Sequence, residues 1–384
     1  MKILLYCYAF SPSIGGIETL TETLARNIVK LGYECTVVTE TLSEENLNFP
    51  FNIIRSPSLK NLSKLIGKVD VVCNIELSMK FFFLSKLASK PLIWVHNGYK
   101  LMCIDALGWF GDGPAPIDPW QSFFFYKKKK GLVFSLREGA KLFARRWAAN
   151  NIYCNVACSK WVDKRQPLKN QVQLYTPYPI ERFIAVGEML DKKYDFMFVG
   201  RLVPEKGVDT LLYAFQDLMI KTRNYSFKLA IVGYGAAEGF LKELSSELNL
   251  NGNVFFLGPK MGNELLKTIV QTEIAVIPSY WEEPLGGISL ELMAAGRIVI
   301  VSKNGGMTEC IGEAGLTFTN GNWKELSQKM QEAWSNIPAF KESSKEMRKA
   351  QINKFEPEQL THEFIKLFKN AKAKKSGKCR VFKG

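Results

Sequence analysis

The chain has 384 residues, of which 47% are hydrophobic and 23% are charged. This length favours two domains, and the composition excludes a disordered chain. The formal net charge of +14 lies mainly in two segments: residues 120–150 hold five Lys and three Arg against one Glu, and residues 371–384 hold five Lys, one Arg and no acid. Basic patches of this kind usually bind an anionic surface, either lipid or nucleic acid.

The N-terminal residues 1–13 form a short apolar run that could be mistaken for a signal peptide. A glycine turn and an amphipathic segment follow it without a cleavage pattern, so we interpret the run as a buried first strand. No apolar run reaches the roughly 18 residues of a membrane-spanning helix. The eight cysteines form no CxxC pair and lie mostly in apolar runs, which indicates core residues in a reducing compartment. Cys154 and Cys158 lack zinc-ligand spacings, so no metal site is predicted.

Apolar, β-rich runs alternate with helical patterns along most of the chain. The predicted strands of the first half lie in residues 2–10, 34–40, 51–56, 69–76, 91–98 and 151–159. Those of the second half lie in residues 195–202, 228–235, 253–260, 273–279, 298–303 and 315–320. Runs this apolar are typical of parallel strands covered by helices on both faces. We therefore predict an α/β fold with two doubly wound domains.

The proline-rich residues 175–183 mark the expected domain boundary. The predicted division is an N-terminal domain at 1–178, a C-terminal domain at 179–355, and a terminal helix with a basic tail at 356–384. The segment 99–130, rich in Gly, Pro and Trp, is too long for a simple connection, and loops of that length are usually functional or mobile.

Two segments of the first half are candidate binding elements. Gly15 and Gly16 lie between a strand and a helix, where they would let the backbone approach an anion at the helix N-terminus. An ordinary β–α turn is the alternative. His96, one of two histidines, follows an apolar strand at its carboxyl end, where doubly wound sheets bind ligands. A structural histidine is the alternative there.

Two segments of the second half suggest an anionic ligand that carries hydroxyl groups. Arg201 and Lys206 lie between a strand and a helix and together suit a diphosphate, although they could be ordinary solvated cations. Glu283 lies in a loop before a helix that is expected to begin near Gly287, and Glu291 lies about one turn into that helix. The amides of Gly287, Ile288 and Ser289 are expected to be free at the helix start, where they can bind phosphate, and carboxylates accept hydrogen bonds from hydroxyls. Alternatively, both acids only favour the helix dipole.

In their order and spacing these segments resemble the retaining glycosyltransferases of family 4, which have the GT-B fold. The resemblance covers nearly the whole chain and is strongest at 195–335, where Glu283 and Glu291 match the E-x7-E signature. It implies two Rossmann-like domains facing across a cleft, and a C-terminal helix that crosses back to the N-terminal domain. It also implies a metal-independent reaction without a cofactor, in which a nucleotide-diphosphate sugar, UDP-linked rather than GDP-linked, donates a hexose.

The resemblance also implies roles for single residues. The catalytic set would be His96, Arg201, Lys206 and Glu283: the two cations would hold the diphosphate, while Glu283 and His96 would contact the donor sugar. Glu291 would bind the ribose. The remaining donor-binding positions would be Gly15, Gly16, Gly233, Lys260, Met261, Gly286, Gly287, Ile288 and Ser289. A front-face mechanism is favoured over a covalent intermediate on Glu283.

The segment 131–149 has helical spacing, with an apolar stripe of Leu136, Ala140, Phe143 and Trp147 beside a basic one. This pattern suits an anionic membrane surface, whereas a core-facing helix with a basic outer face is the alternative. The predicted membrane-contact residues are Lys127, Lys128, Lys129, Lys130, Arg137, Lys141, Arg145 and Trp147. No recognition motif for nucleic acid accompanies the charge.

The sequence therefore predicts a glycosyltransferase that uses a glycolipid or lipid-linked glycan as acceptor, in cell-envelope polysaccharide or glycolipid synthesis. It would lie in the cytoplasm, peripherally bound to the inner face of the cytoplasmic membrane. The alternatives are a transferase with a soluble acceptor, another GT-B enzyme such as a UDP-GlcNAc 2-epimerase or a phosphorylase, and a non-catalytic binding protein of the same fold.

Overall fold

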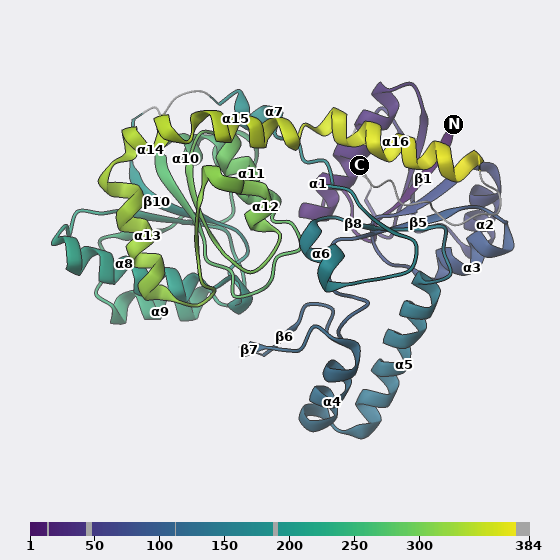
Figure 1. Ribbon diagram of the computed structural model, residues 1–384, viewed down its shortest axis with the longest axis horizontal. Helices are drawn as coiled ribbons and strands as arrows, with labels where there is room; N and C mark the ends of the chain where they lie inside the picture. The colour runs from purple at the N-terminus through teal and green to yellow at the C-terminus, as the bar shows by residue number, and fades with distance from the viewer. Residues whose placement is uncertain (14, 44–47, 112, 187–190, 374–384) are drawn as a thin grey trace. The chain divides into compact units, whose positions relative to one another are not determined.

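The computed structural model describes residues 1–13, 15–43, 48–111, 113–186 and 191–373. The chain divides into two compact units (Figure 1). Unit 1 contains Met1–Gly108, Ala115–Pro179 and the C-terminal segment from Phe355, and unit 2 contains Trp109–Pro114 and Ile180–Lys354. From residue 374 onward, the predicted basic tail lies outside the described residues. No helix in the described ranges is long and apolar enough to cross a membrane.

Unit 1 is built on a parallel sheet with the strand order β3-β2-β1-β4-β5-β8-β9. Its strands are β1 (Lys2–Tyr6), β2 (Glu34–Thr39), β3 (Asn52–Arg55), β4 (Val71–Asn74), β5 (Leu92–His96), β8 (Cys154–Ala157) and β9 (Gln171–Gln173). The six strands predicted for this half are confirmed. The sequence did not predict β9, because its three residues, Gln-Val-Gln, have no apolar run.

Helices cover both faces of this sheet (Figure 1). The helices of unit 1 are α1 (Gly16–Lys30), α2 (Leu59–Lys68), α3 (Met79–Leu87), α4 (Pro119–Lys130), α5 (Leu132–Ala149), α6 (Lys160–Arg165) and α16 (Pro357–Ala373). Apolar side chains of α1 and α16 share one core with the sheet, and those of α2 and α3 share the core on the opposite face. As expected, the C-terminal helix thus returns to the N-terminal unit, where Lys30 pairs with Glu358.

Unit 2 has a parallel sheet with the strand order β12-β11-β10-β13-β14-β15. Its strands are β10 (Tyr194–Val199), β11 (Leu229–Val232), β12 (Val254–Phe256), β13 (Thr272–Ile277), β14 (Ile298–Ser302) and β15 (Leu316–Phe318). Its helices are α7 (Glu181–Ile184), η1 (Pro204–Lys206), α8 (Val208–Thr222), α9 (Glu238–Glu247), α10 (Gly262–Val270), α11 (Gly287–Ala294), α12 (Met307–Ile311), η2 (Gly312–Ala314), α13 (Trp323–Ser335), α14 (Ile337–Ser343) and α15 (Lys345–Lys354). All six strands predicted for this half are confirmed.

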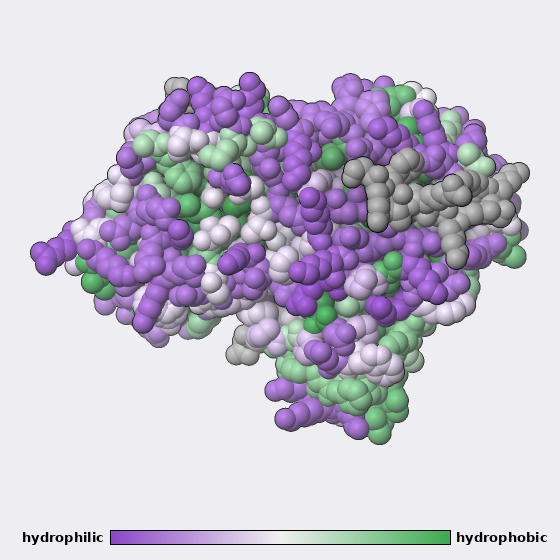
Figure 2. All heavy atoms as spheres, in the orientation of Figure 1, coloured by the Kyte–Doolittle hydropathy of each residue, from purple (hydrophilic) through white to green (hydrophobic). Residues whose placement is uncertain are grey.

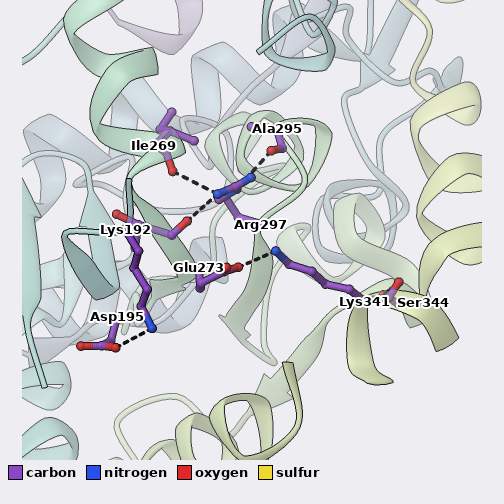
Figure 3. A network of polar contacts seen from close by, with 9 residues as sticks. Lys192, Asp195, Ile269, Glu273, Ala295, Arg297, Lys341 and Ser344 are labelled. Atoms are coloured by element: carbon purple, nitrogen blue, oxygen red, sulfur yellow. Dashed lines mark hydrogen bonds and ion pairs between the residues drawn. The ribbon is translucent and has the colours of Figure 1, made fainter. Parts of the chain in front are cut away.

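A polar network closes the end of this sheet at which β13 and β14 begin (Figure 3). The buried Arg297 donates to the carbonyl oxygens of Thr272 (2.6 Å) and Ala295 (3.1 Å). Nearby, Glu273 pairs with Lys341 of α14. The contacts of Arg297 satisfy backbone oxygens that burial would otherwise leave without a donor. This network lies at the amino ends of the strands, so the opposite edge remains for a ligand.

The segment 99–130, which is too long for a simple connection, contains regular structure of its own. It contains a short hairpin of β6 (Trp109–Phe110) and β7 (Gly113–Pro114), followed by the helix α4. Asp118 caps α4 by accepting from the amides of Trp120 (3.0 Å) and Gln121 (2.9 Å), and Pro119 occupies the first turn. These are ordinary helix-start signals, and they explain why the helix begins there.

Candidate functional site

Most of the predicted donor-site residues of unit 2 lie where its strands end. The chain adds strands on one side of β10 as far as β12 and then returns to the other side of β10 with β13. Doubly wound sheets bind their ligands at this kind of switch point, beyond the carboxyl ends of the strands. Arg201 and Lys206 follow β10, and Glu283 lies in the loop that follows β13. The topology therefore brings both predicted groups to one place.

Lys206 and Glu283 form an ion pair. Glu283 Oε1 also accepts a hydrogen bond from Ser279 Oγ at 2.8 Å, and the Lys206 ammonium lies 5.5 Å from the centre of the Trp281 ring. Only 15% of the Lys206 side chain and 9% of the Glu283 side chain are exposed. In this arrangement the predicted diphosphate cation and the predicted sugar carboxylate neutralise each other. An anionic ligand that reaches Lys206 must therefore compete with Glu283.

Arg201 is the more accessible cation of the two. Its Nη2 lies 3.8 Å from Glu205 Oε1, and 63% of its side chain is exposed. An ion pair this long and this exposed contributes little to stability. The guanidinium can thus turn to an anion at the end of β10 at small cost.

The loop that carries Glu283 is braced by two glycines that sequence reasoning did not assign a role. The Gly306 amide donates to the Glu283 carbonyl at 2.7 Å, and Gly305 forms a β-bridge with Glu283. A Cβ at Gly306 would lie 2.2 Å from the Pro284 carbonyl oxygen, so no larger residue fits without displacing the loop. The adjacent glycines in the sequence were the available signal. Through this contact, the β14–α12 connection fixes the backbone of Glu283.

Helix α11 begins at Gly287, as predicted. Its cap, Gly286, has a left-handed conformation (φ 83°), and a Cβ there would lie 2.3 Å from Met307 Cγ. One expectation is wrong: the Ser289 amide is not free, because it donates to the Gly286 carbonyl at 3.0 Å. The buried Ser289 hydroxyl donates to the same oxygen at 2.6 Å. Gly287 and Ile288 remain the predicted anion donors at this helix start.

Glu291 is buried on α11, with 9% of the residue exposed. Burial raises the pKa of its carboxyl to about 7, and the charge of Arg182 on α7 offsets this only in part. No hydrogen bond or ion pair of this carboxylate is found among the residues that the structure describes. A buried acid without a partner favours a ligand that supplies hydroxyl donors, as the ribose assignment requires.

The loops expected to hold the nucleotide base lie side by side. The Gly233 amide after β11 donates to the Gly258 carbonyl after β12 at 2.9 Å. A Cβ at Gly233 would lie 1.8 Å from the Gly200 oxygen, so this glycine lets the β11 loop pack against the β10 loop. Lys260 and the exposed Met261 follow in the same β12–α10 connection. Their contact with a base stays a prediction.

In unit 1, His96 ends β5 and is buried. Its Nε2 lies 2.8 Å from Asn155 Oδ1 on the neighbouring strand β8. The Asn155 amide nitrogen donates to the carbonyls of Ala149 and Lys169, both at 2.8 Å, which fixes Oδ1 as the atom that faces the ring. Because Oδ1 can only accept, Nε2 must carry the proton. Burial lowers the pKa of His96 to about 4, so the ring is neutral near pH 7 and Nδ1 can accept a hydrogen bond.

Sequence reasoning missed Asn155, although an amide inside the apolar run 151–159 was a usable signal. We expect Asn155→Leu to shift His96 toward a mixture of tautomers, because the acceptor that holds the Nε2 proton is lost. The chain has only two histidines, so ¹⁵N-detected ring spectra can assign the tautomer directly. The matched control is Asn151→Leu, at an exposed position near the same strand. Unchanged His96 shifts in Asn155→Leu would contradict the assignment.

Gly15 and Gly16 lie at the start of α1, as predicted. A Cβ at Gly15 would lie 2.5 Å from Glu18 Oε2, and Glu18 Oε1 accepts a hydrogen bond from Ser13 Oγ at 3.2 Å. A Cβ at Gly16 would meet only the Tyr178 hydroxyl, at 3.8 Å. Glu18 thus lies against the start of this helix, and the approach of these glycines to a phosphate stays a prediction.

Comparison with known proteins supports the assignment of unit 2. Residues 180–354 match the family described as Glycosyl transferases group 1. An uncharacterized glycosyltransferase of Methanocaldococcus jannaschii is 36% identical over 139 residues, which cover 36% of this chain and 33% of that protein. The D-inositol 3-phosphate glycosyltransferase of Rhodococcus jostii is 31% identical over 126 residues, which cover 31% of this chain and 28% of that protein. The matched region is thus about a third of each relative's length.

Among solved structures, HepE of Anabaena in complex with UDP-glucose aligns with a TM-score of 0.73 and 15% identity. The alignment covers 96% of this chain and 100% of that one. This similarity shows the GT-B fold that the sequence predicted, with two Rossmann-like domains.

Proposed function

We propose that this protein is a glycosyltransferase that transfers a hexose from a nucleotide-diphosphate sugar, preferably a UDP-sugar, to a glycan or lipid-linked acceptor. The premise is that residues 180–354 form a glycosyl transferases group 1 domain. One observation carries the proposal: Arg201, Lys206, Glu283 and the start of α11 converge on the strand ends of that domain. The buried Glu291, whose carboxylate has no hydrogen bond or ion pair within the described part of the chain, lies one turn farther along the same helix.

In the proposed reaction these residues bind and polarise the donor. Arg201 and Lys206 hold the diphosphate and stabilise the negative charge that develops on it as the bond to the sugar breaks. The amides of Gly287 and Ile288 contribute at the helix start. When the diphosphate binds the Lys206 ammonium, it replaces Glu283 in the ion pair. The Glu283 carboxylate can then accept hydrogen bonds from the sugar hydroxyls. Glu291 accepts from the ribose.

We place the enzyme in family 4 and propose transfer with retention, by a front-face mechanism in which a donor phosphate oxygen takes the acceptor proton. The fixed cations and amides supply the stabilisation that a metal ion gives in other transferases, so no metal or cofactor is required. His96 is neutral and donates through Nε2, so that Nδ1 accepts a hydrogen bond from a sugar hydroxyl. It therefore orients the sugar and does not transfer a proton in the reaction.

For the acceptor we propose a glycolipid or lipid-linked glycan at the inner face of the cytoplasmic membrane, in cell-envelope polysaccharide or glycolipid synthesis. The cationic residues 120–150 in unit 1 support a reaction at an anionic surface. Such charge attracts peripheral proteins to anionic lipid without any membrane-spanning segment.

The test is a transfer assay with labelled UDP-sugars, GDP-mannose and a lipid extract, analysed for glycosylated product and released nucleotide. We expect one UDP-sugar to yield both. Conversion of UDP-GlcNAc without any acceptor would favour an epimerase. If no donor is consumed under any condition, the transferase assignment is wrong.

A further inference from the structure

Helices α4 and α5 form an antiparallel hairpin that projects from the body of unit 1 (Figure 1). Three packing contacts of aromatic rings hold the two helices together. The rings of Trp120 and Phe143 lie 4.7 Å apart, those of Tyr126 and Phe134 lie 5.9 Å apart, and the Phe123 ring lies against Gly139. The Tyr126 hydroxyl donates to Asp105 Oδ2 at 2.7 Å, which ties α4 to the preceding loop. The hairpin is thus a built element, held by specific contacts.

The hairpin leaves a continuous apolar stripe of α5 uncovered. The buried residues of α5 are mostly small, and they are Ser135, Gly139 and Leu142, with Ala148 and Ala149 at the base of the helix. Leu132, Leu136, Ala140, Phe143 and Trp147 recur every three or four residues and share one face. Leu136 is 55% exposed and Trp147 is 59% exposed, so the core-facing interpretation of this stripe is wrong for these residues. Phe143 alone is half-buried, against Trp120.

The apolar exposure is greatest at the tip of the hairpin. Val133 is 81% exposed, Leu132 is 51% exposed, and Phe124 on α4 is 59% exposed. Figure 2 shows hydrophobic residues gathered on the projecting hairpin, next to hydrophilic ones. Folded proteins rarely leave a patch of large apolar side chains in water unless the patch has a partner.

Cations surround this stripe. Lys127, Lys128, Lys129 and Lys130 end α4 directly before the turn at Gly131, and all four are exposed. Arg137 and Lys141 lie beside the stripe on α5, where both contact the single acid Glu138, at 2.8 Å and 2.9 Å. The excess of positive charge favours an anionic partner over the same hairpin of a second copy, because two such hairpins repel each other.

We propose that the tip of the α4–α5 hairpin inserts into the headgroup layer of an anionic lipid bilayer. Phe124, Leu132, Val133 and Leu136 enter the boundary of the acyl chains, while the four lysines bind lipid phosphates. This arrangement has an apolar face of a helix flanked by basic side chains, which is how amphipathic helices bind at membrane interfaces. The inference deepens the proposed function, on which it rests for the acceptor, by naming the element that meets the membrane.

The test is flotation of the full chain with vesicles of phosphatidylcholine, with and without phosphatidylglycerol. We expect binding to the anionic vesicles only, and a loss of binding at high salt. The triple variant Leu132→Asn/Val133→Asn/Leu136→Asn should no longer bind the anionic vesicles. Lys127→Gln/Lys128→Gln/Lys129→Gln should bind roughly 100-fold more weakly, since each cation near the surface contributes about fivefold.

Two matched controls separate the tip from general effects. Ile220→Asn removes an equally exposed aliphatic side chain from α8 of unit 2, and Lys60→Gln/Lys64→Gln/Lys68→Gln removes three exposed lysines from α2. Both should float like the unaltered protein, and all variants should keep its melting temperature. The proposal is overturned if the tip variants float as well as the unaltered protein, or if the protein binds neutral vesicles as well as anionic ones. It is also overturned if the protein self-associates and the tip substitutions abolish that association.

Transfer to a short-chain acceptor in the absence of vesicles serves as the second readout. The tip variants should retain this activity, because none of the substituted residues belongs to the set that is proposed to bind the donor. If the protein binds vesicles but transfers sugar from no donor, the proposed function is wrong and the membrane-binding proposal stands. If it transfers sugar but binds no vesicles, the membrane-binding proposal is wrong and the proposed function stands.

Discussion

Lys206→Met is expected to lower kcat by about 10³, the upper range for loss of one group that stabilises charge in a transition state. The reason is that the Lys206 ammonium lies on the carboxylate of Glu283 at the strand ends, where the diphosphate is proposed to leave. KM for the donor should rise much less, because Arg201 still binds the ground-state diphosphate. Steady-state kinetics with the preferred UDP-sugar measure both constants.

The same substitution leaves a buried carboxylate without its cation, which destabilises a protein by about 3 kcal/mol or more. The double variant Lys206→Met/Glu283→Gln removes both charges, so it should recover most of that stability in urea unfolding while it stays inactive. Lys242→Met, which breaks an exposed pair with Glu238 on α9, is the matched control. If the double variant regains activity together with stability, Lys206 acts through folding and not through the donor.

Glu291→Gln is expected to stabilise the protein at high pH and to weaken donor binding. Burial raises the pKa of Glu291 to about 7 from an ordinary value of 4.5. Below pH 4.5 the carboxyl is neutral in both states, so the substitution changes little. As the pH rises from 4.5 to 7, the unfolded chain ionises first and the wild type loses stability. Above pH 7 the full difference, about 3 kcal/mol, separates the two proteins.

Urea unfolding of the wild type and of Glu291→Gln between pH 5 and 8 measures the difference in their free energies of unfolding. Only the change of this difference with pH reports on the ionisation of Glu291. The donor should bind the variant about 10-fold or more weakly at pH 8, because bonds to a charged acceptor are the stronger ones. The wild-type affinity should rise through pH 7 and that of the variant should not. Glu247→Gln, at an exposed position on α9, is the control. A stability difference that stays constant across this range would contradict a buried Glu291 with a raised pKa.

The strands of both units could be predicted because their apolar runs are long and the intervening segments are helical. Strand β9 could not, since Gln-Val-Gln carries no pattern and forms a strand only beside β8. Helix α4 was missed for a different reason. Its aromatic residues surround the helix axis, so no periodicity appears, although Asp118-Pro119 marked its start.

The positions of Glu283, Glu291 and Lys206 followed from motif spacing, but their partners did not. The pairing of Lys206 with Glu283 joins residues 77 apart and requires the switch-point geometry of the sheet. The free amide expected at Ser289 was lost because the left-handed Gly286 turns its carbonyl toward that amide. The tautomer of His96 likewise depends on Asn155 from another strand. Local sequence carries no information on such contacts.

The central claim is that the strand ends of unit 2 bind a nucleotide-diphosphate sugar through Arg201 and Lys206. Titration calorimetry of UDP-sugars against the wild type and against Arg201→Met, Lys206→Met and Lys242→Met tests it most directly. We predict one site, with affinity lowered in the first two variants and unchanged in Lys242→Met. Equal affinities in all four proteins, or no binding to the wild type, would contradict the claim.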